Sequence, residues 1–267
     1  MDQCGSCPLL GSTDPRDLSN TIWRNRMGAF RKLDIHVVCT THWMAEKVRA
    51  SSLLGKKPVS VIPNTVPLDI FYPMRREALR KDLSFAENDF VMMFSSQSLT
   101  NYRKGGQFIL EALHRIADGP DGKRTKVLLL GQHPDEAFFK TGIDVIYCGY
   151  LTDMQQLAVY YNAADVFLFP SLEEAFGQVT AEAAACGTPT VAFAAGGIPE
   201  TIEHGVTGWL APTGSLEGLL EGIRWAKDAA GDPKMRKRCR ILAMERWSPE
   251  KTTHLYAGLF RELAEKD

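Results

Sequence analysis

The sequence has no apolar run that approaches the roughly 20 residues a helix needs to span a bilayer. Its first residues, MDQCGSCPLL, lack the charged and apolar regions of a signal peptide. The formal net charge is only −1, so the charge balance gives no reason to expect nucleic acid as the main partner. Together these absences favour a globular protein of the cytoplasm.

Cysteine is scarce and scattered, and a disulfide framework is not expected. Four of the six cysteines lie in strand-like or helical segments, where reduced cysteine behaves as a small apolar residue; this predicts a reducing compartment. The remaining two, Cys4 and Cys7, form a CxxC. Because no second CxxC or HxxxH follows, a four-ligand zinc site is not expected unless further ligands lie upstream of residue 1.

One local excess of charge is the basic cluster Lys234–Arg240, KMRKRCR. A solvated helix face is the usual fate of such a run, and we expect that here. The alternative is a weak contact with an acidic membrane surface, which would hold the protein peripherally at the inner face of the membrane.

The segment 63–73, PNTVPLDIFYP, has three prolines and no helical period, which indicates a linker between two folding units. Residues 1–62 before it hold a helix over 21–32 and two short strands. Over residues 74–250, short and continuously apolar strands alternate with helices, and a helix covers the last residues, 251–267. The expected strands are 90–95, 126–130, 144–147, 165–169, 190–193 and 208–210. This pattern predicts an α/β fold with a doubly wound parallel sheet covered on both faces.

In such sheets ligands bind beyond the carboxyl ends of the strands. The segment Ser171–Gly177, SLEEAFG, follows a strand and precedes a helix, whose first N–H groups favour anionic or hydroxyl oxygens. Glu174 lies in this loop, and Glu182 follows about two turns into the helix. Two such carboxylates suit a polyhydroxylated ligand. The alternative is that Glu174 caps the helix and Glu182 belongs to a solvated face.

The run DVFLFPSLEEAFGQVTAEAAACGTPTV, followed by AGGIPETIEHGVTGWL, closely resembles the group 1 (family four) retaining glycosyltransferases of the GT-B architecture, over about residues 60–265. The resemblance implies a Rossmann-like domain that binds a nucleotide-diphosphate sugar. It implies that Glu174 binds donor-sugar hydroxyls and that Glu182 binds the ribose. The backbone expected near the sugar and phosphates belongs to Ala175, Phe176, Gly177, Gln178 and Val179.

A second element is Asn101–Gly106, NYRKGG, where a lysine beside two glycines can reach a diphosphate. The resemblance makes Lys104 the diphosphate lysine, with Gly105 beside it, and makes Lys104 and Glu174 the catalytic pair. The family often has an arginine where this chain has Ser98; either Arg103 compensates or the subgroup manages without it.

The third element, CGYL, follows a strand and ends on Tyr150 and Leu151. The resemblance implies that this backbone contacts the nucleotide base. For the Tyr150 ring itself two outcomes stay open, stacking on the base or packing in the core.

The resemblance implies transfer of a hexose from a UDP- or GDP-sugar to a glycan or lipid-linked acceptor, with retention and without a cofactor or metal. Residues 1–62 supply only the end of an N-terminal acceptor domain, so we expect a truncated or split enzyme. Two alternatives remain: a nucleotide-sugar epimerase of the same architecture, and a non-catalytic nucleotide-sugar-binding module. The motif alone predicts that Glu174→Ala leaves nucleoside diphosphate affinity nearly unchanged.

Overall fold

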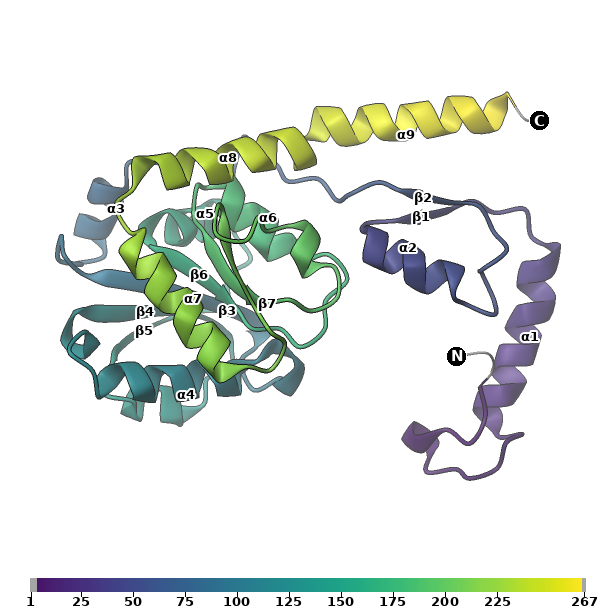
Figure 1. Cartoon of the computed structure of the whole chain (residues 1–267), viewed down its shortest axis with the longest axis horizontal. Coiled ribbons are helices and arrows are strands. Elements are labelled where there is room, and N and C mark those ends of the chain that lie inside the picture. The colour runs from purple at the N-terminus through teal and green to yellow at the C-terminus, as the bar shows by residue number, and fades with distance from the viewer. Residues whose placement is uncertain (1–3, 266–267) are drawn as a thin grey trace. The chain divides into compact units, whose positions relative to one another are not determined.

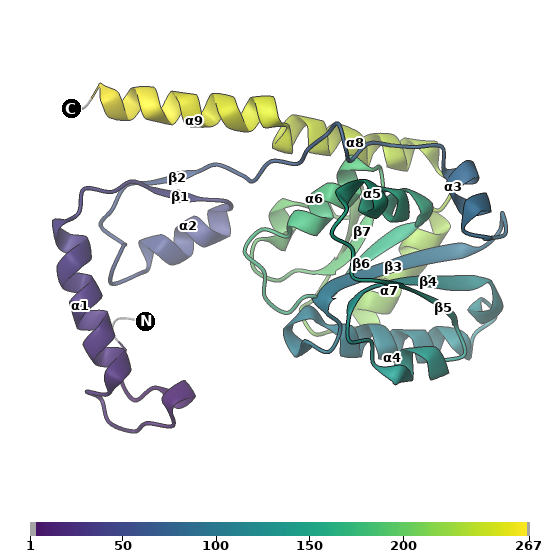
Figure 2. The same ribbon diagram turned by 180° about the vertical axis from the view of Figure 1, so that it is seen from behind.

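The computed structural model describes residues 4–265, which form two compact units that divide between Pro63 and Asn64 (Figures 1 and 2). The first unit contains two parallel strands and two helices. Helix α1 begins three residues before the predicted start because the Asp17 side chain accepts a hydrogen bond from the Asn20 N–H and caps it. The elements are α1 (Leu18–Lys32), β1 (Val37–Cys39), α2 (His42–Arg49) and β2 (Val59–Val61).

The second unit is built on a six-stranded parallel sheet of order β5-β4-β3-β6-β7-β8. Every side chain of 91–94, 127–130 and 166–169 is buried, which explains why these strands are apolar at each position and not only at alternate ones. The doubly wound parallel sheet is thereby confirmed. The strands are β3 (Phe90–Ser98), β4 (Thr125–Gln132), β5 (Asp144–Gly149), β6 (Val166–Phe169), β7 (Thr190–Phe193) and β8 (Gly208–Ala211).

Helices cover both faces of this sheet: α4 and α7 pack on one face, and α5, α6 and α8 on the other (Figures 1 and 2). The helices are α3 (Arg76–Asp82), α4 (Gly106–Ala117), α5 (Met154–Ala163), α6 (Gln178–Ala185), α7 (Leu216–Asp228), α8 (Pro233–Trp247) and α9 (Pro249–Ala264). Short 3₁₀ turns cover Pro8–Leu10, Tyr102–Lys104, Gly122–Arg124, Glu136–Lys140 and Ile198–Glu200. Within residues 4–265, no helix has the length and apolar character needed to cross a membrane.

The basic cluster Lys234–Arg240 lies in α8 and is not the uniformly solvated face that its composition predicts. The Arg236 guanidinium donates to the Asn162 side-chain oxygen at 3.0 Å, and that of Arg240 donates to the Phe71 carbonyl at 2.6 Å. These contacts stabilise the helix against the rest of the unit, and burial lowers the pKa of Arg236. The other three cations, Lys234, Lys237 and Arg238, are exposed.

Helix α3, which the sequence pattern does not predict, is joined to the sheet through Asp165. This carboxylate lies directly before β6 and forms ion pairs with both Arg76 and Arg80 of α3. It also accepts a hydrogen bond from the Val91 N–H at 2.7 Å. One buried carboxylate therefore connects the helix with the amino ends of the two central strands.

Candidate functional site

The candidate site lies where the strand order reverses. From β3 the chain proceeds outward to β4 and β5, returns to β6 on the other side of β3, and continues outward to β7 and β8. The carboxyl ends of β3 and β6 therefore flank the topological switch point, the usual ligand crevice of doubly wound sheets. Strand β3 leads to the turn containing Lys104, and β6 leads to the loop containing Glu174.

Gly105 and a backbone hydrogen bond join these two segments, and Gly196 packs against the Glu174 loop from its far side. Gly105 has φ +79°, and a Cβ atom there would lie 2.0 Å from the Pro170 carbonyl oxygen. The Leu172 N–H donates to the Arg103 carbonyl at 2.8 Å. On the far side of the loop, a Cβ at Gly196 would lie 2.0 Å from a backbone carbonyl oxygen. The glycines are required because the backbones themselves are in contact.

Lys104 and Glu174, which lie 70 residues apart in the sequence, form an ion pair at this point. The Lys104 Nζ donates to the Glu174 Oε2 at 2.7 Å and lies 5.7 Å above the Phe169 ring. The Arg103 guanidinium donates to the Glu173 carbonyl at 2.6 Å and lies 3.9 Å from the same Glu174 oxygen. The structure thus brings two cations to one carboxylate.

Glu182 has a different environment. Its side chain is half-buried on α6, and its Oε2 accepts a hydrogen bond from the Tyr161 hydroxyl at 3.3 Å. Burial raises the pKa of Glu182 to about 7, and hydrogen bonds from Tyr161 and Gln178 oppose this only in part. The alternative interpretation, in which Glu182 belongs to a solvated face, is therefore wrong. Tyr161, which no sequence motif indicated, is its partner from α5.

Helix α6 begins without a side-chain cap because its N-cap residue is Gly177, at φ +83°. Glu174 is not that cap, since its carboxylate is held by Lys104.

Phe176 is buried and packs edge-on against the Trp247 ring at 6.2 Å, which fixes the loop just before the helix. Gln178 donates from its side chain to the Thr65 carbonyl at 3.0 Å. Ala175 and Val179, the other backbone positions of the predicted site, are half-buried.

The remaining predicted residues lie at the ends of β3 and β5. The Ser98 hydroxyl is 3.1 Å from the Thr100 hydroxyl at the end of β3. Tyr150 follows β5 and is 48% exposed, so its ring is not part of the core. Leu151 packs partly against the core. Strand β5 is two strands away from β3. Tyr150 and Leu151 therefore lie at the carboxyl ends of the strands, as Lys104 does, but near the outer strand of the sheet.

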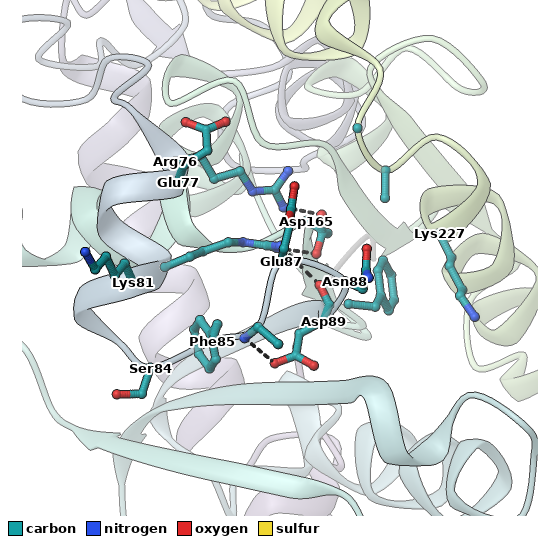
Figure 3. Close-up of a pocket in the computed structure, with 15 residues that line it drawn as sticks. Arg76, Glu77, Lys81, Ser84, Phe85, Glu87, Asn88, Asp89, Asp165 and Lys227 are labelled. Carbon is teal, nitrogen blue, oxygen red and sulfur yellow. Dashed lines mark hydrogen bonds and ion pairs between the residues drawn. The ribbon is translucent and has the colours of Figure 1, made fainter.

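A separate hollow of about 950 Å³ lies at the amino ends of β3 and β6, the opposite edge of the sheet (Figure 3). Four basic and four acidic side chains line it, so it has no net charge to attract an anionic diphosphate. Asp165 and Arg76 belong to it; burial lowers the pKa of Arg76 to about 10. Its lining already forms the ion pairs that fix α3, and we assign it a structural role.

Within the part of the chain that the structure describes, no three or more His, Cys, Asp or Glu side chains are grouped to hold a metal ion. Cys4 is exposed and Cys7 is half-buried, and both are free thiols.

Comparison with known proteins relates this geometry to a family. Residues 89–227 match the family described as Glycosyl transferases group 1. N-acetyl-alpha-D-glucosaminyl L-malate synthase of Bacillus anthracis is 26% identical over 79% of this chain and 55% of its own length. Among solved structures, sucrose-phosphate synthase from Thermosynechococcus elongatus has a TM-score of 0.75 at 24% identity, over 99% of this chain and 67% of that one. HepE from Anabaena, solved in complex with UDP and glucose, has a TM-score of 0.71 at 22% identity, over 90% and 66%.

The parallel sheet with its polar residues at the switch point defines an α/β protein of GT-B-like architecture. The family match extends over just more than half of the sequence, and the chain belongs to the group 1 glycosyl transferases. It spans about half the length of the curated relatives that it matches.

Proposed function

We propose that this chain carries the donor site of a retaining glycosyltransferase that moves a hexose from a UDP- or GDP-sugar to a glycan or lipid-linked acceptor. The observation that carries the proposal is the Lys104–Glu174 pair at the switch point, 2.7 Å between Nζ and Oε2. A cation for the diphosphate and a carboxylate for the sugar hydroxyls are the two groups that such a donor needs side by side.

In this proposal Lys104, assisted by Arg103, binds the diphosphate and stabilises the charge that develops on it as the leaving group departs. The uncapped amino end of α6, from Ala175 to Val179, adds backbone N–H groups and the positive end of the helix dipole. Glu174 binds the hexose. Catalysis then consists of positioning and charge stabilisation, and no side chain serves as a nucleophile.

The ribose and the base of the donor also lie along the carboxyl ends of the strands. Glu182 binds the ribose hydroxyls, and the backbone at Tyr150 and Leu151 receives the base, with the Tyr150 ring free to stack on it. HepE was solved with UDP and glucose, which supports a nucleotide-sugar ligand for this architecture. Ser98 leaves the diphosphate without one commonly used arginine, and Arg103 takes that role.

The experiment is a thermal-shift panel of UDP, GDP and their hexose derivatives on the full chain, followed by product analysis with the best ligand. Ligand at 100 times its Kd should add about 2.7 kcal/mol to the free energy of unfolding. A shift with transfer or donor hydrolysis supports the proposal. Epimerised sugar would favour an epimerase, and binding without any chemistry would fit either the donor half of a split enzyme or a binding module. No shift with any nucleotide would refute the donor site itself.

A further inference from the structure

The lysine assigned to the diphosphate has an ionic partner within the protein itself. Lys104 Nζ and Glu174 Oε2 are in direct contact, and their side chains are only 23% and 20% exposed. Arg103, by contrast, is 45% exposed and 3.9 Å from the same oxygen. Partial exclusion from water strengthens the Lys104–Glu174 pair relative to an ordinary surface ion pair. A diphosphate that binds this lysine therefore competes with the Glu174 carboxylate for it.

Backbone contacts on the far side of the loop oppose relief of this competition by movement of the backbone. The Glu174 carbonyl accepts a hydrogen bond from the Gly197 N–H at 2.9 Å, and Gly196 approaches that carbonyl so closely that no Cβ would fit. These contacts favour a Glu174 carboxylate that stays within a side chain's reach of Lys104 and changes partner by rotation of the side chain.

We propose that Glu174 is the resident counterion of the diphosphate site and that it discriminates between the nucleotide-sugar donor and the free nucleoside diphosphate product. The inference rests on the proposed function. When a nucleotide sugar binds, the hexose hydroxyls donate hydrogen bonds to the carboxylate that Lys104 has left. A free nucleoside diphosphate has no such hydroxyls, and its terminal phosphate brings further negative charge toward the carboxylate. Glu174 thus weakens product binding more than donor binding and favours product release.

The prediction differs from that of the motif alone, in which loss of the Glu174 carboxylate leaves nucleoside diphosphate affinity unchanged. Glu174→Gln keeps the size of the side chain and removes its charge, so Lys104 loses its ionic partner and the contact weakens. We expect UDP or GDP, whichever binds, to bind about tenfold tighter, while the matching nucleotide sugar gains nothing. The dissociation constant of the nucleoside diphosphate, divided by that of the nucleotide sugar, should therefore fall about tenfold.

Calorimetry on the full chain tests this with matched variants. Glu173→Gln removes the same charge from the next residue, whose side chain is exposed, and should change diphosphate affinity much less. On a Lys104→Gln background, Glu174→Gln should give a smaller gain, because no lysine remains to be released. Ligand-free melting temperatures verify that each variant is folded.

The possible results separate the two proposals. One possible result is that Lys104→Gln weakens diphosphate binding but Glu174→Gln does not tighten it. This result would overturn the counterion inference and leave the proposed donor site intact. An equal gain from Glu173→Gln would also overturn it, since the effect would then be one of net charge. A wild-type chain that binds no nucleotide, or binds one regardless of Lys104, would overturn both.

Discussion

The two glutamates of the motif lie eight residues apart and have opposite electrostatic environments. Glu174 contacts a lysine, whereas Glu182 accepts its hydrogen bonds from the neutral side chains of Tyr161 and Gln178 and has a pKa of about 7. The spacing of the motif predicts both as ligands of one molecule. The difference between their environments depends largely on Lys104 and Tyr161, which come from other segments. The spacing of the motif contains no information about these partners.

Glu182 makes stability depend on pH. An acid whose pKa is raised in the folded state holds a proton that the unfolded chain releases, so its contribution to stability falls as pH rises from 4.5, its ordinary pKa, to about 7. The loss is on the order of 3 kcal/mol. Urea unfolding at pH 5 and pH 8 should show a smaller loss for Glu182→Gln than for wild type. The exposed Glu111→Gln is the control; identical pH dependence in all three proteins would contradict the burial of Glu182.

Lys104 should matter only to ligands with phosphates. Lys104→Ala should weaken UDP or GDP by about 10- to 150-fold, the range that corresponds to one charged hydrogen bond of 1.5–3 kcal/mol, and should leave the free nucleoside unchanged. Calorimetry with both ligands measures this, with the exposed Lys140→Ala as control. Equal losses for nucleoside and diphosphate would mean that the lysine acts through folding.

At the scale of elements, the sequence predicts the strands well because most of them are apolar along most of their length and are followed closely by glycine, proline or serine. Two helices escape prediction. Helix α3 buries none of its side chains fully, so it has little apolar periodicity, and its position depends on Asp165, more than 80 residues away. Helix α8 is obscured by its basic cluster, although Met235, Cys239 and Leu242 form a buried stripe.

The contact between the two site loops should depend on Gly105. Gly105→Ala places a Cβ 2.0 Å from the Pro170 carbonyl, so the loops must separate and diphosphate affinity should fall about tenfold or more. Gly214→Ala is the matched control, because Gly214 has φ +80° and open space around it. Both variants should lose about 1–2 kcal/mol from the left-handed backbone, but only the first should lose binding. Equal binding by both would contradict the close approach.

Helix α3 should depend on the carboxylate of Asp165. Asp165→Asn leaves Arg76 and Arg80 without their ionic partner in a buried position, and we expect a loss of about 3–5 kcal/mol. Asp144→Asn breaks the more exposed pair with Lys126 and should cost at most about 1 kcal/mol. Denaturant unfolding compares the two variants; similar small losses would mean that water replaces the Asp165 contacts.

At the scale of the whole molecule, the candidate site depends on the order in which the strands are arranged. The sequence shows that strands and helices alternate, but β3 and β6 lie some 70 residues apart, and only the sheet order makes them neighbours. From the sequence alone, only the resemblance to the family places Lys104 and Glu174, which follow these two strands, at one site. The hollow at the opposite edge has no counterpart in any sequence motif, since it is enclosed by α3, the start of β3 and the end of α7.

The central claim, that a nucleotide diphosphate binds at the carboxyl ends of β3 and β6, is tested most directly by a crystal structure of the chain with UDP or GDP. We predict the diphosphate beside Lys104 Nζ and the amino end of α6, with the Glu174 carboxylate turned away from the lysine. A nucleotide in the hollow beside Asp165 would contradict the central claim. One bound at the switch point with the Lys104–Glu174 pair intact would confirm that claim and contradict only the counterion inference.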